Sequence, residues 1–146
     1  MAALTGQQTI ITLRSDGPGG FLSAANGAAS TIWPPPPSDA EKHAFGPEFG
    51  TPINYGQYVG LLSNNAWLSL DGSWTATDVG DQQSWQIVHP DDPAASGPVT
   101  IGSKIILRSN TTGNFLKPNG DGPVNVDSDT PENAVWVVGD LNGVEQ

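Results

Sequence analysis

The sequence predicts an all-β fold built from three copies of one structural unit. Its 146 residues match the size of one domain, typically about 100 to 150 residues. The 18 glycines and 13 prolines favour turns, and the low share of charged residues, 14%, disfavours long amphipathic helices. The apolar runs are short, rich in β-branched residues and bounded by Gly, Asn or Pro, as in strands joined by hairpins. We therefore expect one all-β domain over residues 1–146.

An aromatic residue followed by Leu and then by an Asn/Asp-Gly turn occurs three times, at Phe21-Leu22, Trp67-Leu68 and Phe115-Leu116. A short apolar run ending in Ser precedes each pair. Self-similarity at a near-constant period indicates repeated supersecondary units. The expected copies cover approximately residues 8–54, 55–98 and 99–142.

The third copy shows the order of elements in the unit. Residues 105–109 predict a strand, 110–114 a five-residue hairpin loop and 115–116 the returning strand. A third strand is expected at 124–126 and a fourth, centred on a Trp, at 135–138.

The other two copies vary this order. The second copy shortens the hairpin loop to residues 64–66, with its third strand at 74–76 and its aromatic strand at 84–88. The first copy, which begins with the run 10–15, is degenerate where the aromatic strand should be. Four strands in each of three copies predict twelve strands.

Three four-stranded units in an all-β chain without Cys resemble a β-trefoil, a six-stranded barrel closed by three hairpins around a pseudo-threefold axis. Leu-Arg-Ser runs followed by Phe-Leu are similar to the fascin-like repeat, and Gln83-Ser84-Trp85 is similar to the Gln-x-Trp element of ricin-B-type lectins. The element occurs once: copy three has Ala134 at the Gln position, and copy one lacks the Trp. The resemblance implies carbohydrate binding, although the fold alone does not fix a function.

The charge and composition exclude several partners. Five basic against 15 acidic residues give a formal charge of −10, the wrong sign for binding nucleic acid or anionic membranes. The absence of Cys excludes disulfides and thiolate metal clusters. No stretch approaches the roughly 20 apolar residues of a membrane span, and no leader pattern begins the chain. We expect a soluble, leaderless protein that is cytoplasmic or released by a non-classical route, with no membrane insertion.

The sequence offers no complete catalytic, cofactor or metal site. The two histidines, His43 and His89, lie outside any nucleophile motif. Gly17–Gly20 lacks the Lys-Ser/Thr of a phosphate-binding loop and predicts a hairpin turn. Asp127, Asp129 and neighbouring acids lack the spacing of a calcium loop. We expect a protein that is not an enzyme, with no cofactor and no metal.

The predicted loops combine Asn, Asp and Gly with an aromatic residue, which is the chemistry of a sugar site. Saccharide hydroxyls need acceptors and amide donors at fixed angles, and the apolar face of the sugar stacks on an aromatic ring. The alternative is that these residues only build the hairpin turns. The hypothesis predicts glycan or glycoprotein partners and an accessible Trp74 ring; the alternative is that Trp74 is buried, since Val124 holds the roughly equivalent position in copy three. The candidate carbohydrate-binding residues are Asn64, Asn65, Asp71, Trp74, Asn114, Asn119 and Asp121.

The repeated aromatic residues fit the barrel interior better than a binding site, because equivalent positions next to Leu must fill a threefold core. We therefore expect these side chains to be buried, and we expect Arg14 and Arg108 to be exposed charges at strand ends. The predicted core aromatics are Phe21, Trp67, Phe115, Trp85 and Trp136.

An insert in copy one suggests an alternative function. Ser38–Glu41 has a capping-box pattern that predicts one helical turn, and four prolines before it favour an extended polyproline II segment. A protruding loop such as 31–49 could serve a protease inhibitor, with a protease as partner. A fascin-like cytoskeletal binder is disfavoured by the acidic charge. The possible protein-binding loop is Trp33, Pro34, Pro35, Pro36 and Pro37; its other interpretation is a rigid surface loop.

Overall fold

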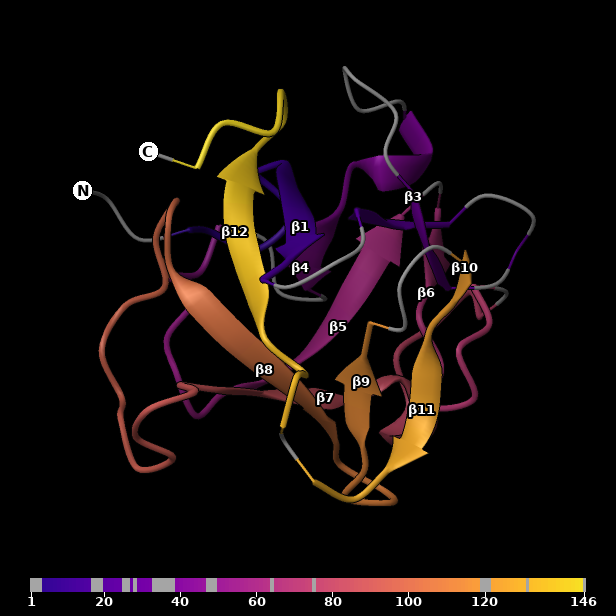
Figure 1. Cartoon of the computed structure of the whole chain (residues 1–146). Coiled ribbons are helices and arrows are strands. Elements are labelled where there is room, and N and C mark those ends of the chain that lie inside the picture. The colour runs from indigo at the N-terminus through magenta and orange to yellow at the C-terminus, as the bar shows by residue number, and fades with distance from the viewer. Residues whose placement is uncertain are drawn as a thin grey trace.

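The computed structural model describes residues 4–16, 20–24, 27, 29–32, 39–46, 50–63, 65–74, 76–118, 122–130 and 132–145. Twelve strands and two one-turn 3₁₀ helices are found within these ranges (Figure 1). The elements are β1 (Ile11–Ser15), β2 (Phe21–Ser23), β3 (Ser30–Ile32), η2 (Asp39–Glu41), β4 (Ala44–Gly46), β5 (Tyr58–Ser63), β6 (Ala66–Trp67), η3 (Asp81–Gln83), β7 (Trp85–Val88), β8 (Lys104–Ser109), β9 (Phe115–Lys117), β10 (Gly122–Pro123), β11 (Asn125–Ser128) and β12 (Trp136–Asp140).

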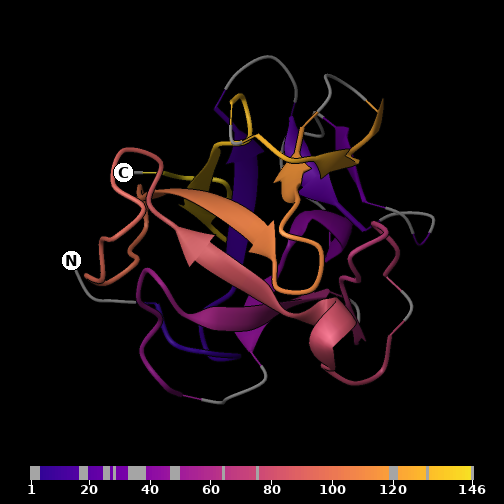
Figure 2. The same ribbon diagram turned by 90° about the horizontal axis from the view of Figure 1, so that it is seen from below.

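Six of the strands form a closed barrel. The antiparallel order β1, β12, β8, β7, β5, β4 makes an almost complete ring. The ring closes between Ile11 of β1 and His43, the residue before β4, whose backbone N–H groups each donate to the other's carbonyl at 2.8 Å. Figure 2 shows these strands surrounding the core, with the remaining strands at the periphery. Closure leaves few sheet edges unpaired.

The core follows the predicted repeat. On the first strand of each copy, every second residue points inward, so Leu13, Leu61 and Leu107 are all buried. The aromatic strands contribute the rings of Trp85 and Trp136, which are 1% and 0% exposed.

The strand count agrees with the prediction, but its distribution over the copies does not. The third strand expected in copy two, at 74–76, is reduced to a bridge between Trp67 and Ala76. Copy three instead has five strands, because β10 leaves its own copy and pairs with β3 of copy one. Its neighbour β11 pairs with β9 across a register shift between Asn125 and Ser128.

The first copy is not degenerate at its fourth strand, which corrects the prediction. Trp85 Nε1 donates to the carbonyl of Leu68 at 3.1 Å, and Trp136 Nε1 donates to the equivalent Leu116 at 2.9 Å. In copy one, His43 makes this contact, with Nε2 at 2.7 Å from the carbonyl of Leu22. A histidine therefore replaces the repeated Trp, and a pattern based on aromatic residues missed it.

The Gln-x-Trp element also has a counterpart in the first copy. Gln83, at the end of η3, donates from Nε2 to the hydroxyl of Ser69 at 2.9 Å. Glu41, at the end of η2, accepts from the hydroxyl of the equivalent Ser23 at 2.5 Å. The helical turn predicted near residue 39 is confirmed, and η3 adds a second turn that the sequence analysis did not predict.

Four of the five predicted core aromatics are buried, and one is not. Phe21 and Trp67 are 8% and 7% exposed, and the two Trp residues of the fourth strands are fully enclosed. Phe115 is only half-buried, because it lies on the outer face of β9 beneath the guanidinium of Arg108. Phe115 therefore belongs to the outer surface of the barrel and not to its core.

Candidate functional site

Four side chains form a continuous row across the outer face of the barrel. Tyr58 of β5 pairs with Gln86 of β7, Gln86 pairs with Arg108 of β8, and Arg108 pairs with Phe115 of β9. Directly opposed residues of antiparallel strands have their side chains on the same face. We call Tyr58, Gln86, Arg108 and Phe115 the cross-strand row. Tyr58 and Arg108 are exposed, and the other two are half-buried.

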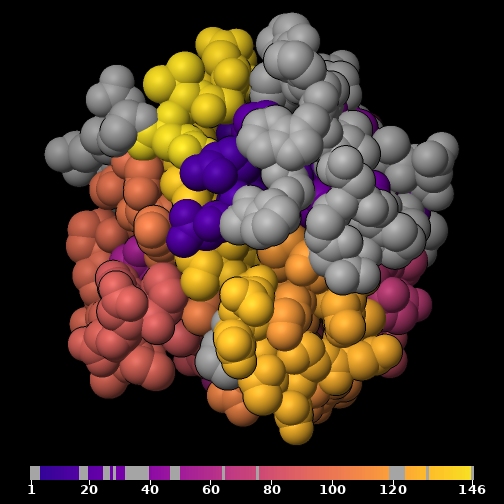
Figure 3. Space-filling model, in the orientation of Figure 1, coloured from indigo at the N-terminus to yellow at the C-terminus, as the bar shows by residue number. Residues whose placement is uncertain are grey.

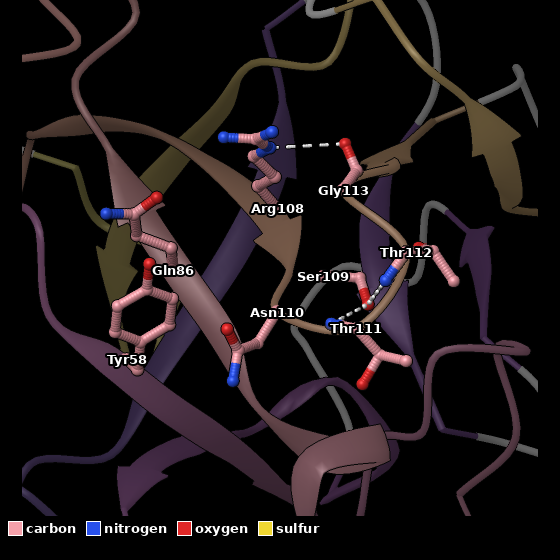
Figure 4. Close-up of a pocket in the computed structure, with 8 residues that line it drawn as sticks. All are labelled: Tyr58, Gln86, Arg108, Ser109, Asn110, Thr111, Thr112 and Gly113. Carbon is pink, nitrogen blue, oxygen red and sulfur yellow. Dashed lines mark hydrogen bonds between the residues drawn. The ribbon is translucent and has the colours of Figure 1, made fainter.

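A polar hollow of about 330 Å³ lies along this row. The side chains of Tyr58, Gln86 and Arg108 line it, together with the loop between β8 and β9 (Figure 4). Tyr58 is 56% exposed, whereas the other described Phe, Trp and Tyr residues are buried or half-buried. The loop residues that line the hollow are Ser109, Asn110, Thr111, Thr112 and Gly113.

The loop is held in place by its own hydrogen bonds. The hydroxyl of Ser109 accepts from the backbone N–H groups of Thr111 and Thr112, at 3.3 Å each. Gly113, at a φ of 76°, closes the turn with a backbone bond to Ser109 at 3.0 Å. Arg108 Nε donates to the Gly113 carbonyl at 3.2 Å. The wall of the hollow is therefore organised without a ligand.

A second, more apolar hollow of about 180 Å³ lies on the other side of the row. It shares Gln86 and Arg108 with the polar hollow, and its remaining lining is mostly apolar. Gln86 and Arg108 thus stand between a polar and an apolar compartment. The other residues lining the apolar hollow are Val88, His89, Pro90, Pro93, Ile106 and Phe115.

The two hollows offer amide, hydroxyl and guanidinium groups around exposed aromatic surface. Gln86 and Asn110 each supply an amide donor and acceptor, and Thr111 and Thr112 supply hydroxyls. Among the residues described at either hollow, none is Asp or Glu. These groups can form hydrogen bonds with a polar ligand that lies against the aromatic surface.

The structure spreads the sequence-predicted sugar residues over several turns. Asn65 is exposed in a turn at a φ of 64°. Asp71 is exposed, and its Oδ1 accepts from the N–H and hydroxyl of Ser73 at 3.0 and 2.7 Å, which lowers the pKa of Asp71. Asn114 is half-buried, and its carbonyl accepts from the backbone of Ser109 at 2.7 Å. None of these three lines the hollows.

The expectation that Trp74 offers an accessible ring is wrong. This side chain is 5% exposed and stacks on the buried ring of His43, with centroids 5.2 Å apart. Burial makes it part of the core, so it cannot stack on a sugar. Asn64, Asn119 and Asp121 lie outside the described residues, as do Trp33, Pro34, Pro35, Pro36 and Pro37 of the possible protein-binding loop.

In the hairpin loop of copy three, the sequence analysis named Asn114, which does not line the hollows, and it did not name Tyr58 or Gln86, which do. A usable signal was present. Each of these residues occupies an outward position in a strand whose inward positions are apolar, as Gln86 does between Trp85 and Ile87. Arg108 is exposed at a strand end as expected, but it also belongs to the cross-strand row.

Neither a metal centre nor a membrane helix emerges from the described part of the chain. Its His, Asp and Glu side chains do not gather into a group of three or more that could hold a metal ion. Its helical segments are too short to cross a membrane.

Comparison with solved structures establishes the fold. A protein of unknown function from Caenorhabditis elegans is similar with a TM-score of 0.75 at 13% identity, over 95% of this chain and 97% of that one. A designed threefold-symmetric protein, ThreeFoil, gives 0.62 at 16% identity over 90% and 98%. SeviL bound to asialo-GM1 saccharide gives 0.61 at 15% over 89% and 95%. The chain has the β-trefoil fold. No family model matches it, and no curated protein does.

Proposed function

We propose that this β-trefoil is a carbohydrate-binding protein without catalytic activity, and that the cross-strand row with its polar hollow is the binding site. The observation that carries the proposal is the exposed Tyr58 ring beside the preformed loop 109–113. An aromatic face flanked by amide and hydroxyl groups matches a sugar ring, which has one apolar face and a rim of hydroxyls.

The geometry assigns a role to each group. The ring of Tyr58 provides the stacking platform, while Gln86 and Asn110 can each accept from one sugar hydroxyl and donate to another. Thr111 and Thr112 add hydroxyls at the loop, where their backbone N–H groups are already bonded to Ser109. A rigid loop reduces the ordering cost of binding, which favours useful affinity at a shallow site.

The structural comparisons support the proposal at a general level. SeviL, a protein of this fold, has been solved with the asialo-GM1 saccharide bound. Saccharide binding is therefore among the functions that the β-trefoil fold carries. The site proposed here rests on this chain's own residues, because at 15% identity the likeness concerns the fold alone.

A glycan array with the whole chain, followed by calorimetric titration of a bound glycan, tests the proposal. Tyr58→Ala should weaken binding by about tenfold or more, since loss of one aromatic platform costs on the order of 1 to 3 kcal/mol. Its thermal melting curve should change little, because the ring is mainly exposed. Asn110→Ala should weaken binding in the same direction.

Leu141→Ala is the matched control, because this residue is another exposed large apolar side chain, 44% exposed, that lines neither hollow. It should leave affinity unchanged. Absence of binding to every glycan, or wild-type affinity in Tyr58→Ala, would reject the proposed site.

A further inference from the structure

The pseudo-threefold symmetry places two further rows on the barrel at positions equivalent to the cross-strand row. In one, Lys104 pairs with Val137, Val137 with Arg14, and Arg14 with Phe21. This row has an arginine and a phenylalanine at the places that Arg108 and Phe115 occupy in the cross-strand row. The partners of Arg14 and Arg108 can therefore be compared within one molecule.

The remaining row differs because it is apolar. Ala44 of β4 pairs with Leu62 of β5, and Leu62 pairs with Trp67 of β6. Ala44 and Trp67 are buried, and Leu62 stands where the other rows carry an arginine.

At the equivalent arginine, the chain supplies its own carboxylate. Glu145 Oε2 accepts from Arg14 Nε at 2.6 Å, and Oε1 accepts from Nη2 at 3.0 Å. The hydrogen bond to Glu145 raises the pKa of the Arg14 guanidinium. Lys104, at the head of the same row, forms an ion pair with Asp16 at 3.2 Å. Figure 3 shows the C-terminal segment, in yellow, beside the indigo N-terminal strand on this side of the molecule.

Arg108 has no such internal partner among the described residues. Its Nε is used by the Gly113 carbonyl, and the guanidinium carbon lies 6.0 Å from the centre of the Phe115 ring. No described carboxylate forms an ion pair with it. Nη1 and Nη2 therefore present a fixed, unused pair of donors between the two hollows, the geometry that a carboxylate accepts in a bidentate manner.

We propose that Arg108 selects saccharides that carry a carboxylate, such as uronic or sialic acids; the inference rests on the proposed carbohydrate-binding function and names its ligand class. The carboxylate binds Nη1 and Nη2 of Arg108, whereas the Glu145 carboxylate binds Nε and Nη2 of Arg14, because Gly113 already uses the Nε of Arg108. The sugar ring extends into the polar hollow toward Tyr58, with its hydroxyls near Gln86 and Asn110. The apolar hollow beside Phe115 receives an apolar substituent or the face of a neighbouring sugar.

The overall charge of −10 does not prevent this selection. Exposed charges farther away than the Debye length, about 8 Å at physiological ionic strength, are largely screened. The interaction therefore depends on nearby groups, and neither hollow has a described carboxylate in its lining. Arg108 lines both hollows, so it can contact an anion that binds in either one.

Paired glycans that differ in one group test the inference. Glucuronate and galacturonate oligosaccharides are compared with the corresponding glucose and galactose oligomers, and sialyllactose is compared with lactose. We expect at least one acidic member to bind about fivefold to tenfold more tightly than its neutral partner, with a difference that shrinks as salt is raised. Arg108→Gln should bring the ratio of acidic to neutral affinity close to one, and Arg108→Lys should restore only part of the difference.

Two control variants separate the local role of Arg108 from net charge. Lys117→Gln removes one positive charge from neighbouring β9, and Arg14→Gln removes the arginine at the equivalent position. Both should retain the acidic preference, with folding checked by thermal melting.

The outcomes distinguish the two proposals. Equal affinity for acidic and neutral partners, a preference for sulfated over carboxylated sugars, or an acidic preference that survives Arg108→Gln would overturn the role of Arg108 and leave carbohydrate binding standing. Failure of every saccharide to bind would overturn both.

Discussion

His43 Nε2 lies 2.7 Å from the carbonyl oxygen of Leu22, so the first copy uses a histidine for the contact that Trp85 and Trp136 make in the other two. A carbonyl only accepts, so Nε2 carries the proton in the neutral ring. The ring is 1% exposed, and Nδ1 has no hydrogen-bond partner among the described residues. A buried ring in this setting strongly favours its neutral form.

The first prediction concerns stability in acid. Burial lowers the pKa of His43 from 6.5 to about 4, although the bond to Leu22 and the charge of Glu41 act in the opposite direction. Between these values the unfolded chain binds a proton that the folded chain does not, so the free energy of unfolding rises with pH. This contribution is complete above about pH 6.5 and is lost as pH falls to about 4, for a total of about 3 kcal/mol. Urea denaturation across this range measures it.

Replacement of His43 provides the comparison for the acid-stability prediction. His43→Gln keeps an N–H donor for Leu22 but cannot take up a proton, so its unfolding free energy should depend less on pH than that of the wild type. Parallel pH profiles for wild type and His43→Gln would contradict the assignment.

The second prediction tests how Trp67 is packed. A Cβ added at Gly60 would lie 2.7 Å from Trp67 Cε3 and 2.8 Å from Val79 Cγ2, and one added at Gly46 would lie 2.6 Å from Trp67 Cη2. The indole therefore crowds both glycines, and at Gly60 the Val79 side chain adds to the crowding. Gly60→Ala should destabilise the fold by about 1 to 3 kcal/mol, and Trp67→Ala by about 3 to 5 kcal/mol.

Combining Gly60→Ala with Trp67→Ala separates steric conflict from a general loss of stability. The alanine at Gly60 should cost less in the double variant, because the ring that it meets has been removed. Chemical denaturation of all four forms gives the coupling energy. Additive effects would show that the Trp67 indole is not what excludes a side chain at Gly60.

The fold was predictable from sequence to a large extent, because the repeated aromatic-Leu pair and the Ser-terminated apolar runs encode the barrel strands. Two features escaped prediction for physical reasons. His43 could replace a Trp because the requirement is a ring N–H aimed at the Leu22 carbonyl. The strand expected at 74–76 is reduced to a bridge. The backbone of Trp74 bonds to copy one instead, and the sequence of copy two does not show contacts with another copy.

The site was less predictable than the fold. Asn and Asp are common both in turns and in sugar sites, so the composition of the loops led to the prediction of turn residues such as Asp71 as sugar-binding. The cross-strand row depends on register between four strands, and a sequence shows which residues face outward but not which ones are neighbours. Tyr58 and Phe115 belong to one row because β7 and β8 connect their strands in a fixed register.

The third prediction concerns Asp71, which the sequence analysis placed in the sugar site. Its Oδ1 is used by Ser73, and the residue lines neither hollow. Asp71→Ala should leave glycan affinity unchanged and reduce stability by no more than about 1 kcal/mol, as for loss of an exposed turn hydrogen bond. Calorimetric titration beside Tyr58→Ala measures the contrast. A large loss of affinity in Asp71→Ala alone would return the site to this turn.

The last prediction concerns the internal ion pair between Arg14 and Glu145. The two side chains are 27% and 25% exposed, so solvent screens the pair, but its two hydrogen bonds fix the geometry. A double-mutant cycle with Arg14→Gln and Glu145→Gln should give a coupling energy of about 0.5 to 1 kcal/mol, the upper range for exposed pairs. Raising the salt concentration should reduce this energy, because the charges are accessible to ions. Urea denaturation at low and high salt provides the measurement, and a coupling near zero at low salt would show that the pair does not hold the C-terminal segment against β1.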